Sequence, residues 1–129
     1  MDLKRYFEET EGTGVLATSD IMGNVDAAIY ARPHFMEDGT VALIMKDRLS
    51  HANLQSNPRA TFLFTEKGNG YRGKRLYMTK VGEEKDTERL FELRQRTYPE
   101  TDPVEGDPRF LVFFNIEKTL PLMGTGRET

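Results

Sequence analysis

The chain has 129 residues, which is enough for one domain with its own core and too few for two domains of ordinary size. Its 18 Lys and Arg against 21 Asp and Glu give a net charge of −3, so no overall basic field favours nucleic acid. The absence of cysteine excludes disulfides and thiolate chemistry, and no run approaches the roughly 18 apolar residues that span a membrane. We therefore expect one cytoplasmic, soluble domain over residues 1–129.

The first half of the chain reads as a short helix followed by strands that are joined by tight turns. Asp2 can cap a helix in which Leu3, Tyr6 and Phe7 fall on one face at helical spacing. Glycine with asparagine or aspartate at two later places is typical of tight turns, so the flanking runs are predicted to form hairpins. The predicted strands are residues 15–18, 25–35 and 40–46.

The second half alternates helices and strands. Ser50 is predicted to cap a short helix that follows the third strand. A longer helix, with Leu90, Phe91 and Leu93 as its buried stripe, is stopped by proline. The predicted elements are strands at residues 60–65, 75–81 and 110–122, a helix at 84–98, and an exposed connection at 99–108.

The last strand opens with FLVFF, a run that is apolar on both faces. One face belongs to the core, and the other must be covered by a neighbouring element or by a second subunit. The whole pattern predicts a mainly β (α+β) fold of six antiparallel strands with flanking helices. Closing this sheet into a barrel would remove its exposed edges.

Residues 68–73 spell GxGxxG, the dinucleotide-binding pattern. That pattern works only where a strand precedes it and a helix follows it. Here a strand follows, so we interpret these glycines as a loop between two strands.

The most informative stretch is residues 41–58, where an apolar strand runs into basic residues and then into a helix. Lys46 and Arg48 end the strand, and the free N–H groups of the helix lie beside Ser50 and His51. With Arg32 from the preceding strand, these groups could converge on one anion such as a phosphate. The alternative is that the two cations are a solvated strand end and that Ser50 is only a helix cap.

Pro33 lies inside a strand-like run, between Arg32 and His34. Proline removes a ladder donor, so backbone groups could be left free there for a planar ligand; otherwise the strand simply ends at Ala31. His34 has no second ligand at metal spacing and is interpreted as a surface histidine, so no metal site is predicted. No catalytic triad or paired carboxylates occur, so a bound cofactor would have to supply any reactivity.

A few segments follow one another in a characteristic order and spacing: GVLAT at residues 14–18, residues 39–46, SHANL at residues 50–54, the NP at 57–58, and residues 60–64. In these segments the chain resembles the pyridoxamine 5′-phosphate oxidase-like family of FMN-binding split β-barrels. The resemblance implies a six-stranded split β-barrel, a homodimer, and FMN in clefts between the subunits. The partner would close each cleft through residues 71–74 or 122–124.

The resemblance also implies which residues meet the coenzyme. Residues 30–33 and 44–47 would lie beside the flavin ring and the ribityl chain. Basic and helix-start residues would hold the phosphate. The cofactor-binding residues so implied are Tyr30, Ala31, Arg32, Pro33, Ile44, Met45, Lys46, Asp47, Arg48, Ser50 and His51.

Two departures make pyridoxamine phosphate oxidation an unexpected activity. Many relatives carry lysine or arginine in the short helix, where this chain has Ser50, His51 and Ala52. The Arg- and His-containing C-terminal segment of the true oxidases is not recognisable after Phe114. We expect an FMN-binding redox protein that passes electrons or hydride between a nicotinamide or protein donor and an acceptor. The alternative is a non-catalytic module that holds FMN, haem or a deazaflavin for storage or sensing.

Overall fold

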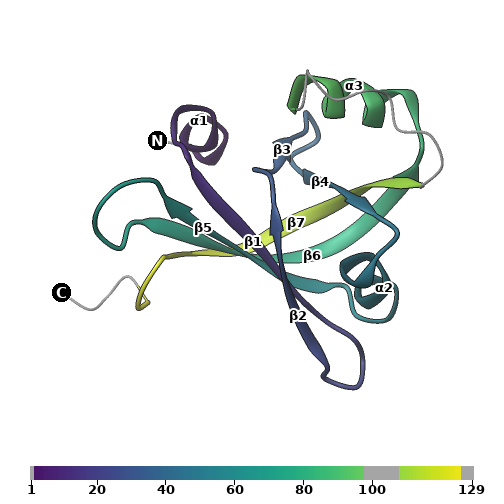
Figure 1. The fold of residues 1–129 in the computed structure, drawn as a ribbon, viewed down its shortest axis with the longest axis horizontal. Helices are drawn as coiled ribbons and strands as arrows, with labels where there is room; N and C mark the ends of the chain where they lie inside the picture. The colour runs from purple at the N-terminus through teal and green to yellow at the C-terminus, as the bar shows by residue number, and fades with distance from the viewer. Residues whose placement is uncertain (1, 98–107, 126–129) are drawn as a thin grey trace.

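The computed structural model describes residues 2–97 and 108–125, and within them the chain forms one curled antiparallel sheet with three helices around it (Figure 1). The strand order is β2-β1-β5-β6-β7-β4-β3, and every neighbouring pair is antiparallel. The elements are α1 (Leu3–Glu9), β1 (Gly12–Ser19), β2 (Val25–Tyr30), β3 (His34–Phe35), β4 (Val41–Lys46), α2 (Leu49–Ser56), β5 (Arg59–Glu66), β6 (Gly73–Lys85), α3 (Glu88–Thr97) and β7 (Arg109–Pro121).

The two edge strands of this sheet, β2 and β3, are consecutive in the chain. Only residues 31–33 separate Tyr30 from His34, so these two residues lie within about 14 Å of each other. The sheet must therefore curl until its edges come close, which gives a barrel that is split along one side.

The predicted strand at residues 25–35 is wrong in one respect, because it is broken into β2 and β3. Pro33 has no N–H to donate and restricts the backbone of Arg32, so pairing with β1 ends at Tyr30 and the chain pairs again at His34, now with β4 at the other edge of the sheet. This break is why the sheet has seven strands rather than the predicted six. The antiparallel arrangement and the curled sheet agree with the prediction.

The main core lies inside the curl and is rich in phenylalanine. Phe62, Phe64 and Phe114 are fully buried there. From α1, Phe7 packs edge to face on Phe64, with ring centroids 5.0 Å apart. The helix begins where the sequence predicts, since the Asp2 carboxylate accepts a hydrogen bond from Arg5 N at 2.8 Å.

The two apolar faces of β7 are both covered within this chain. Phe110, Val112 and Phe114 point into the main core. Leu111 lies in a second cluster with Leu90 of α3. A neighbouring element, α3, therefore supplies one of the two predicted covers for FLVFF.

Helix α3 begins at Glu88, later than predicted, because residues 82–85 pair with β7 as part of β6. Leu90 is buried and Leu93 packs on the second cluster, as predicted. Phe91 is 40% exposed, so its predicted place in the buried stripe is wrong. Residue 98 and residues 99–107 of the predicted connection at 99–108 lie outside the described residues.

The GxGxxG segment forms the loop between β5 and β6, as interpreted from the sequence. Gly68 and Gly70 have φ angles of 116° and 96°, which a residue with a side chain rarely adopts. Strand β6, not a helix, begins at Gly73. In the described part of the chain, no helix is long and apolar enough to cross a membrane.

Candidate functional site

A cleft of about 1440 Å³ lies along the split in the sheet. Its walls come from the end of β2, the break at residues 31–33, β3, the second half of β4 and the start of α2. Residues of α1 and α3 line it as well. The proline that breaks the strand thus also opens the space into which a ligand can fit.

Most of the residues predicted to bind the cofactor line this cleft. Asp47 instead borders a smaller neighbouring pocket, and His51 lines neither space. The predicted residues that line the cleft are Tyr30, Ala31, Arg32, Pro33, Ile44, Met45, Lys46, Arg48 and Ser50.

The cleft is positively charged although the chain as a whole is negative. Only two carboxylate side chains, those of Glu8 and Asp26, are among its described lining residues. Such a concentration of one charge favours an anionic ligand. The cations that line it are Lys4, Arg32, Lys46, Arg48, Arg94, Arg96 and Arg109.

The start of α2 leaves backbone donors at the cleft. Arg48 is the N-cap residue, and no side chain caps the helix. The first amide with a helical partner is that of Ala52, which donates to Arg48 O at 3.0 Å. Among the described residues, no acceptor is bonded to the N–H groups of residues 49–51. Uncapped amides and the positive end of the helix dipole form an anion site.

Ser50 is not the helix cap, so that prediction is wrong. The chain turns so tightly at Lys46–Arg48, where Arg48 N donates to Lys46 O at 2.9 Å, that the helix starts at Leu49 and Ser50 falls inside its first turn. The residue is 4% exposed and lies close enough to the Tyr30 hydroxyl to lower the pKa of that phenol. Ser50 therefore ties the start of α2 to the end of β2.

Tyr30 presents a protonated phenol at the cleft. Burial raises its pKa, and the nearby carboxylate of Asp26 raises it further, against an opposing effect of the Ser50 hydrogen bond. At neutral pH the hydroxyl can therefore donate a hydrogen bond. It is the only such donor from β2 that lines the described cleft.

Arg32 lines the cleft but also has a structural task. Its guanidinium donates to the carbonyl oxygens of Phe7 and Thr10, both at 2.9 Å. These carbonyls lie at the C-terminal end of α1, where a cation is favourable. Arg32 thus fixes the break at residues 31–33 against α1.

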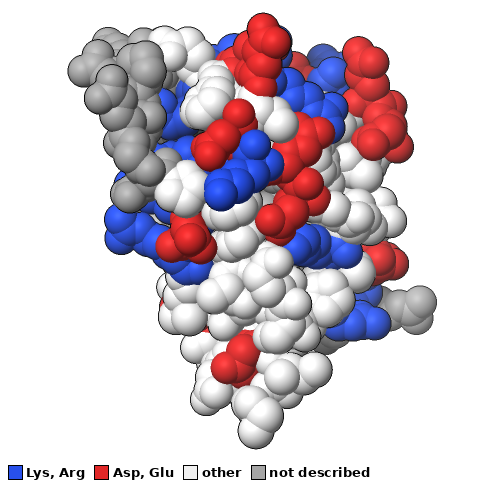
Figure 2. Space-filling model, turned by 90° about the vertical axis from the view of Figure 1, so that its right-hand side faces the viewer, with Lys and Arg blue, Asp and Glu red and all other residues white. Residues whose placement is uncertain are grey.

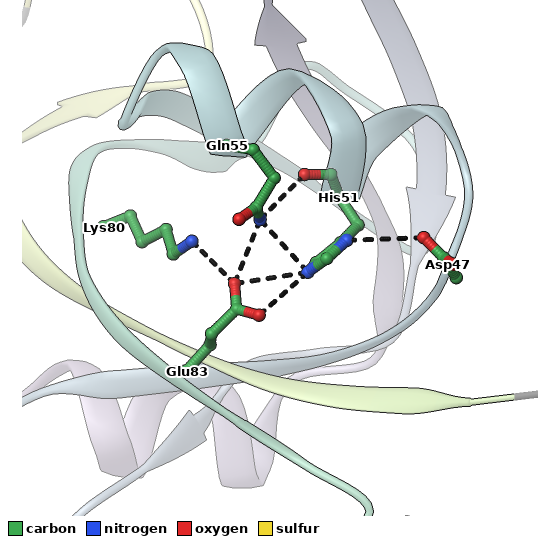
Figure 3. Close-up of polar contacts among 5 residues, drawn as sticks. All are labelled: Asp47, His51, Gln55, Lys80 and Glu83. Carbon is green, nitrogen blue, oxygen red and sulfur yellow. Dashed lines mark hydrogen bonds and ion pairs between the residues drawn. The ribbon is translucent and has the colours of Figure 1, made fainter.

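His51 points away from the cleft into a network between α2 and β6 (Figure 3). Its Nε2 lies 3.0 Å from Glu83 Oε2, and its Nδ1 lies 3.6 Å from Asp47 Oδ1. The imidazole also stacks on Phe110, with ring centroids 3.6 Å apart. The structure therefore leaves only the backbone N–H of His51 at the helix start, and its side chain is engaged elsewhere.

Glu83 is the centre of this network (Figure 3). Besides His51, it accepts hydrogen bonds from Lys80 Nζ at 2.6 Å and from Gln55 Nε2 at 3.0 Å. Partial burial alone would raise the pKa of Glu83, but the hydrogen bonds from Lys80, His51 and Gln55 outweigh it and lower the pKa to about 2. The network holds α2 on the sheet.

Sequence reasoning missed the contribution of Arg109. This residue pairs directly with Lys46 in the β4–β7 ladder, and it is only 5% exposed. Its backbone is fixed by Asp86, whose carboxylate accepts from Arg109 N at 2.9 Å. Only the strand order reveals that a residue so distant in sequence lies beside Lys46.

His34 is half-buried in the cleft wall, so its interpretation as a surface histidine is wrong. Burial lowers its pKa, and the charge of Arg96 on α3 lowers it further. Its environment depends on α3, which comes some sixty positions later in the chain.

Comparison with solved structures identifies the architecture. The chain is similar to an FMN-binding protein from Syntrophomonas wolfei, with 22% identity over 93% of this chain and 83% of that chain, and a TM-score of 0.70. The shared fold is the split β-barrel. Another similar split barrel is a Listeria innocua protein provisionally assigned as a pyridoxamine 5′-phosphate oxidase, at 17% identity over 94% and 98% of the two chains with a TM-score of 0.65.

The haem storage protein HutZ from Vibrio cholerae is similar as well, at 16% identity over 92% of this chain and 91% of that chain with a TM-score of 0.69. No protein-family model matches the chain, and no curated protein does. The split-barrel fold expected from the sequence is thus confirmed. Solved proteins named as FMN-binding and as haem storage proteins have the same fold.

Proposed function

We propose that this protein binds FMN in the cleft and acts as a redox protein. In this role it would pass electrons or hydride between a nicotinamide or protein donor and an acceptor. The observation that carries the proposal is the uncapped start of α2, whose free amides lie beside Lys46 and Arg48 with Arg109 across the ladder. These donors suit a phosphate dianion.

The residues at the split fit the rest of the coenzyme. Residues 31–33 belong to neither β2 nor β3, so backbone groups there are available to a planar ring. Ile44 and Met45 supply an apolar wall, and the Tyr30 hydroxyl supplies a donor. Arg32 would keep the break rigid through its bonds to α1. The bound flavin would supply the electron-accepting chemistry, because the described cleft presents no carboxylate and histidine pair suited to acid–base work.

We also propose a homodimer that uses the outer face of β1 and β2. On this face Ile29 is 71% exposed and Val25 is 81% exposed. Val15 pairs with Ile29 on one side and with Leu63 on the other, which makes the apolar strip continuous across three strands. Figure 2 agrees with this, since the lower part of the molecule, where the β1–β2 hairpin projects in Figure 1, carries few charges.

A dimer could also explain two segments that do not line the cleft of their own subunit. Residues 71–74 and 122–124 lie side by side, because Leu122 N donates to Gly73 O at 3.1 Å. The guanidinium of Arg75 bonds the carbonyl oxygens of Pro121 and Gly124. Closure of the cleft by these segments of a partner remains a prediction.

The dimer is tested by Ile29→Lys, which places a charge in the middle of the strip. We expect wild-type protein to have a dimeric mass by light scattering and the variant to be monomeric with an unchanged far-UV spectrum. Wild-type protein of monomeric mass would contradict the proposal. Lys118→Ala, a change on the outer side of β7, serves as a control that leaves the mass unaltered.

The visible spectrum tests the flavin itself. Protein purified after expression, or mixed with FMN and passed through a desalting column, should retain absorption near the flavin bands. Oxidation of NADH or NADPH by the loaded protein, well above the rate with free FMN, would support the redox role. Protein that retains no flavin after supplementation would remove the proposal.

A second candidate function is haem or flavin binding without turnover. Likeness to a haem storage protein favours it, and His34 lines the cleft where an imidazole could reach a planar ligand. A haem-loaded protein would show a sharp absorption band that changes in His34→Ala. Oxidation of nicotinamide by the FMN-loaded protein would argue against this candidate.

A further inference from the structure

Glu83 reaches α2 because strand β6 contains a bulge. The register between β6 and β7 shifts by one residue directly after Lys80, so Val81 is an extra residue in the ladder. Residues that lie directly opposite each other in an antiparallel pair point to the same face of the sheet. Glu83 lies opposite Val112 of the main core, so it is on the face of the sheet that Leu54 of α2 covers.

Without the extra residue, Glu83 would point the other way. It would then lie opposite Leu111, on the face that packs against α3. Glu84 occupies this position instead, and its carboxylate pairs with Arg89 of α3. Bulges are common where a side chain next to a functional site has to be redirected. The bulge thus directs two neighbouring carboxylates to two different helices, Glu83 to α2 and Glu84 to α3.

The orientation of α2 depends mainly on polar contacts. All of α2 lies within the described residues, and among its buried residues only Leu54 is hydrophobic. The others are Ser50, His51 and Asn53. Apolar contact has no preferred direction, whereas a hydrogen bond has one, so hydrogen bonds fix the rotation of the helix about its axis. Glu83 meets two successive turns of α2, because its Oε2 lies 3.0 Å from His51 Nε2 and its Oε1 accepts from Gln55 Nε2 at 3.0 Å (Figure 3).

His51 connects this network to the proposed phosphate site. Its backbone N–H is one of the proposed donors at the start of α2, while its imidazole stacks on Phe110 with an interplanar angle of 15°. The carbonyl oxygen of His51 also accepts from Gln55 Nε2 at 3.1 Å. A helix could be held on the sheet from any of its turns, but here the network is attached at the turn that carries the proposed donor amides. A binding site needs its donors held to within about 0.5 Å of the productive geometry.

We propose that Glu83, directed by the bulge, is a positioning residue for the phosphate of the flavin. Through His51 it sets the direction of the N–H groups at the start of α2. This inference rests on the proposed function, because it takes the FMN phosphate as the ligand of these amides. A role limited to stability leaves the ligand affinities of a folded variant unchanged, whereas a positioning role lowers the affinity only for ligands that carry a phosphate.

The affinities of Glu83→Gln for FMN and for riboflavin test the inference. Glutamine has nearly the same size but lacks the charge, so the bonds to Lys80 and His51 weaken. At a temperature where wild type and variant are both folded, FMN should bind roughly three- to tenfold more weakly to the variant, whereas riboflavin should bind as in wild type. Unchanged FMN affinity in the folded variant, or an equal loss for both flavins, would overturn the inference.

The matched control is Glu84→Gln, on the neighbouring residue. It removes the same charge, its side chain is 29% exposed against 25% for Glu83, and its network joins β6 to α3 rather than to α2. Both flavin affinities should remain at their wild-type values. An equal loss of FMN affinity in this control would overturn the inference, because net charge would then account for the effect.

A milder variant, Gln55→Ala, provides a second test if Glu83→Gln does not fold. Gln55 is exposed and donates to both Glu83 and His51 O, so its loss should also weaken FMN binding more than riboflavin binding. A preference for FMN equal to that of wild type would overturn the inference.

NMR titration of flavin-free protein with inorganic phosphate separates the inference from the proposed function. In wild type, phosphate should shift the amide signals of residues 49–51, and Glu83→Gln should need a severalfold higher phosphate concentration for the same shifts. This result in a protein that binds no FMN would keep the inference and overturn the proposed function. FMN binding together with equal phosphate titrations of wild type and Glu83→Gln would keep the proposed function and overturn the inference. Wild-type amides that phosphate does not shift would overturn the inference as well.

Discussion

The polar groups on the two sides of α2 differ in whether they have hydrogen-bond partners within the protein. On one side, the N–H groups of residues 49–51 meet the cleft without acceptors among the described residues, and Lys46 and Arg48 lie exposed beside them. On the other side, His51 and Glu83 are enclosed by partners that satisfy them (Figure 3). The polar groups that hold α2 on the sheet are paired, whereas the groups proposed to bind the ligand have no protein partner among the described residues.

The largest effect should come from the cleft side. Replacing both Lys46 and Arg48 by Ala should weaken FMN binding by roughly 1.5–3 kcal/mol per lost charge-assisted contact. Both side chains are exposed, so the free energy of unfolding of the ligand-free protein should change by less than about 0.5 kcal/mol. Fluorescence titration with FMN and urea denaturation measure the two quantities.

The matched control replaces two exposed lysines outside the cleft, Lys67 and Lys85, by Ala. FMN affinity should then remain at the wild-type value. An equal loss in the control would mean that the net charge, rather than the start of α2, determines binding.

The opposite side of α2 should respond in the opposite way. Glu83→Ala leaves Lys80 and His51 without their carboxylate, and we expect the free energy of unfolding to fall by about 1–3 kcal/mol. FMN affinity at a temperature where the variant is folded should change less than it does in the Lys46 and Arg48 variant. A variant of full stability would show that the network does not hold α2 on the sheet.

Low pH should reduce the stability of the protein through the carboxylate of Glu83. The folded-state pKa of Glu83 is about 2, below the 4.5 that is usual for a glutamate side chain, so the unfolded chain takes up the proton first as the pH falls. The stabilisation by Glu83 is thus fully present above about pH 4.5 and is lost as the pH approaches 2. In Glu83→Gln, the free energy of unfolding measured between pH 5 and 2.5 should fall less steeply than in wild type. Parallel curves for the two proteins would contradict this assignment.

The smallest effect is expected at the end of β2. Tyr30→Phe removes one hydroxyl that lies near Ser50 at the cleft, at a cost of about 0.5–1.5 kcal/mol to stability, affinity or both. Comparing FMN affinity with the urea midpoint assigns the loss to one or the other. No change in either quantity would show that the hydroxyl makes no net contribution.

The sequence predicted most of this architecture because its signals are local. Strand runs, turns with glycine, and the Asp2 cap depend on neighbours in the chain, and these agree with the structure. Pro33 was recognised as a possible strand end, but whether it interrupts a strand or ends it depends on how β3 pairs with β4. That pairing is what changed the number of strands from six to seven.

The site was predicted less completely because it depends on long-range pairing. Lys46 and Arg48 were found because they precede a helix directly. Arg109 was missed because only the β4–β7 ladder places it beside Lys46. The side chain of His51 was assigned to the phosphate because its partner Glu83 is 32 residues away, on a strand whose end was read as helix.

The most direct test of the central claim compares FMN with riboflavin, which lacks only the phosphate. If the start of α2 binds that phosphate, FMN should bind at least tenfold more tightly than riboflavin, and the Lys46 and Arg48 double variant should lose most of this difference. Equal affinity of the wild-type protein for the two flavins would contradict the account.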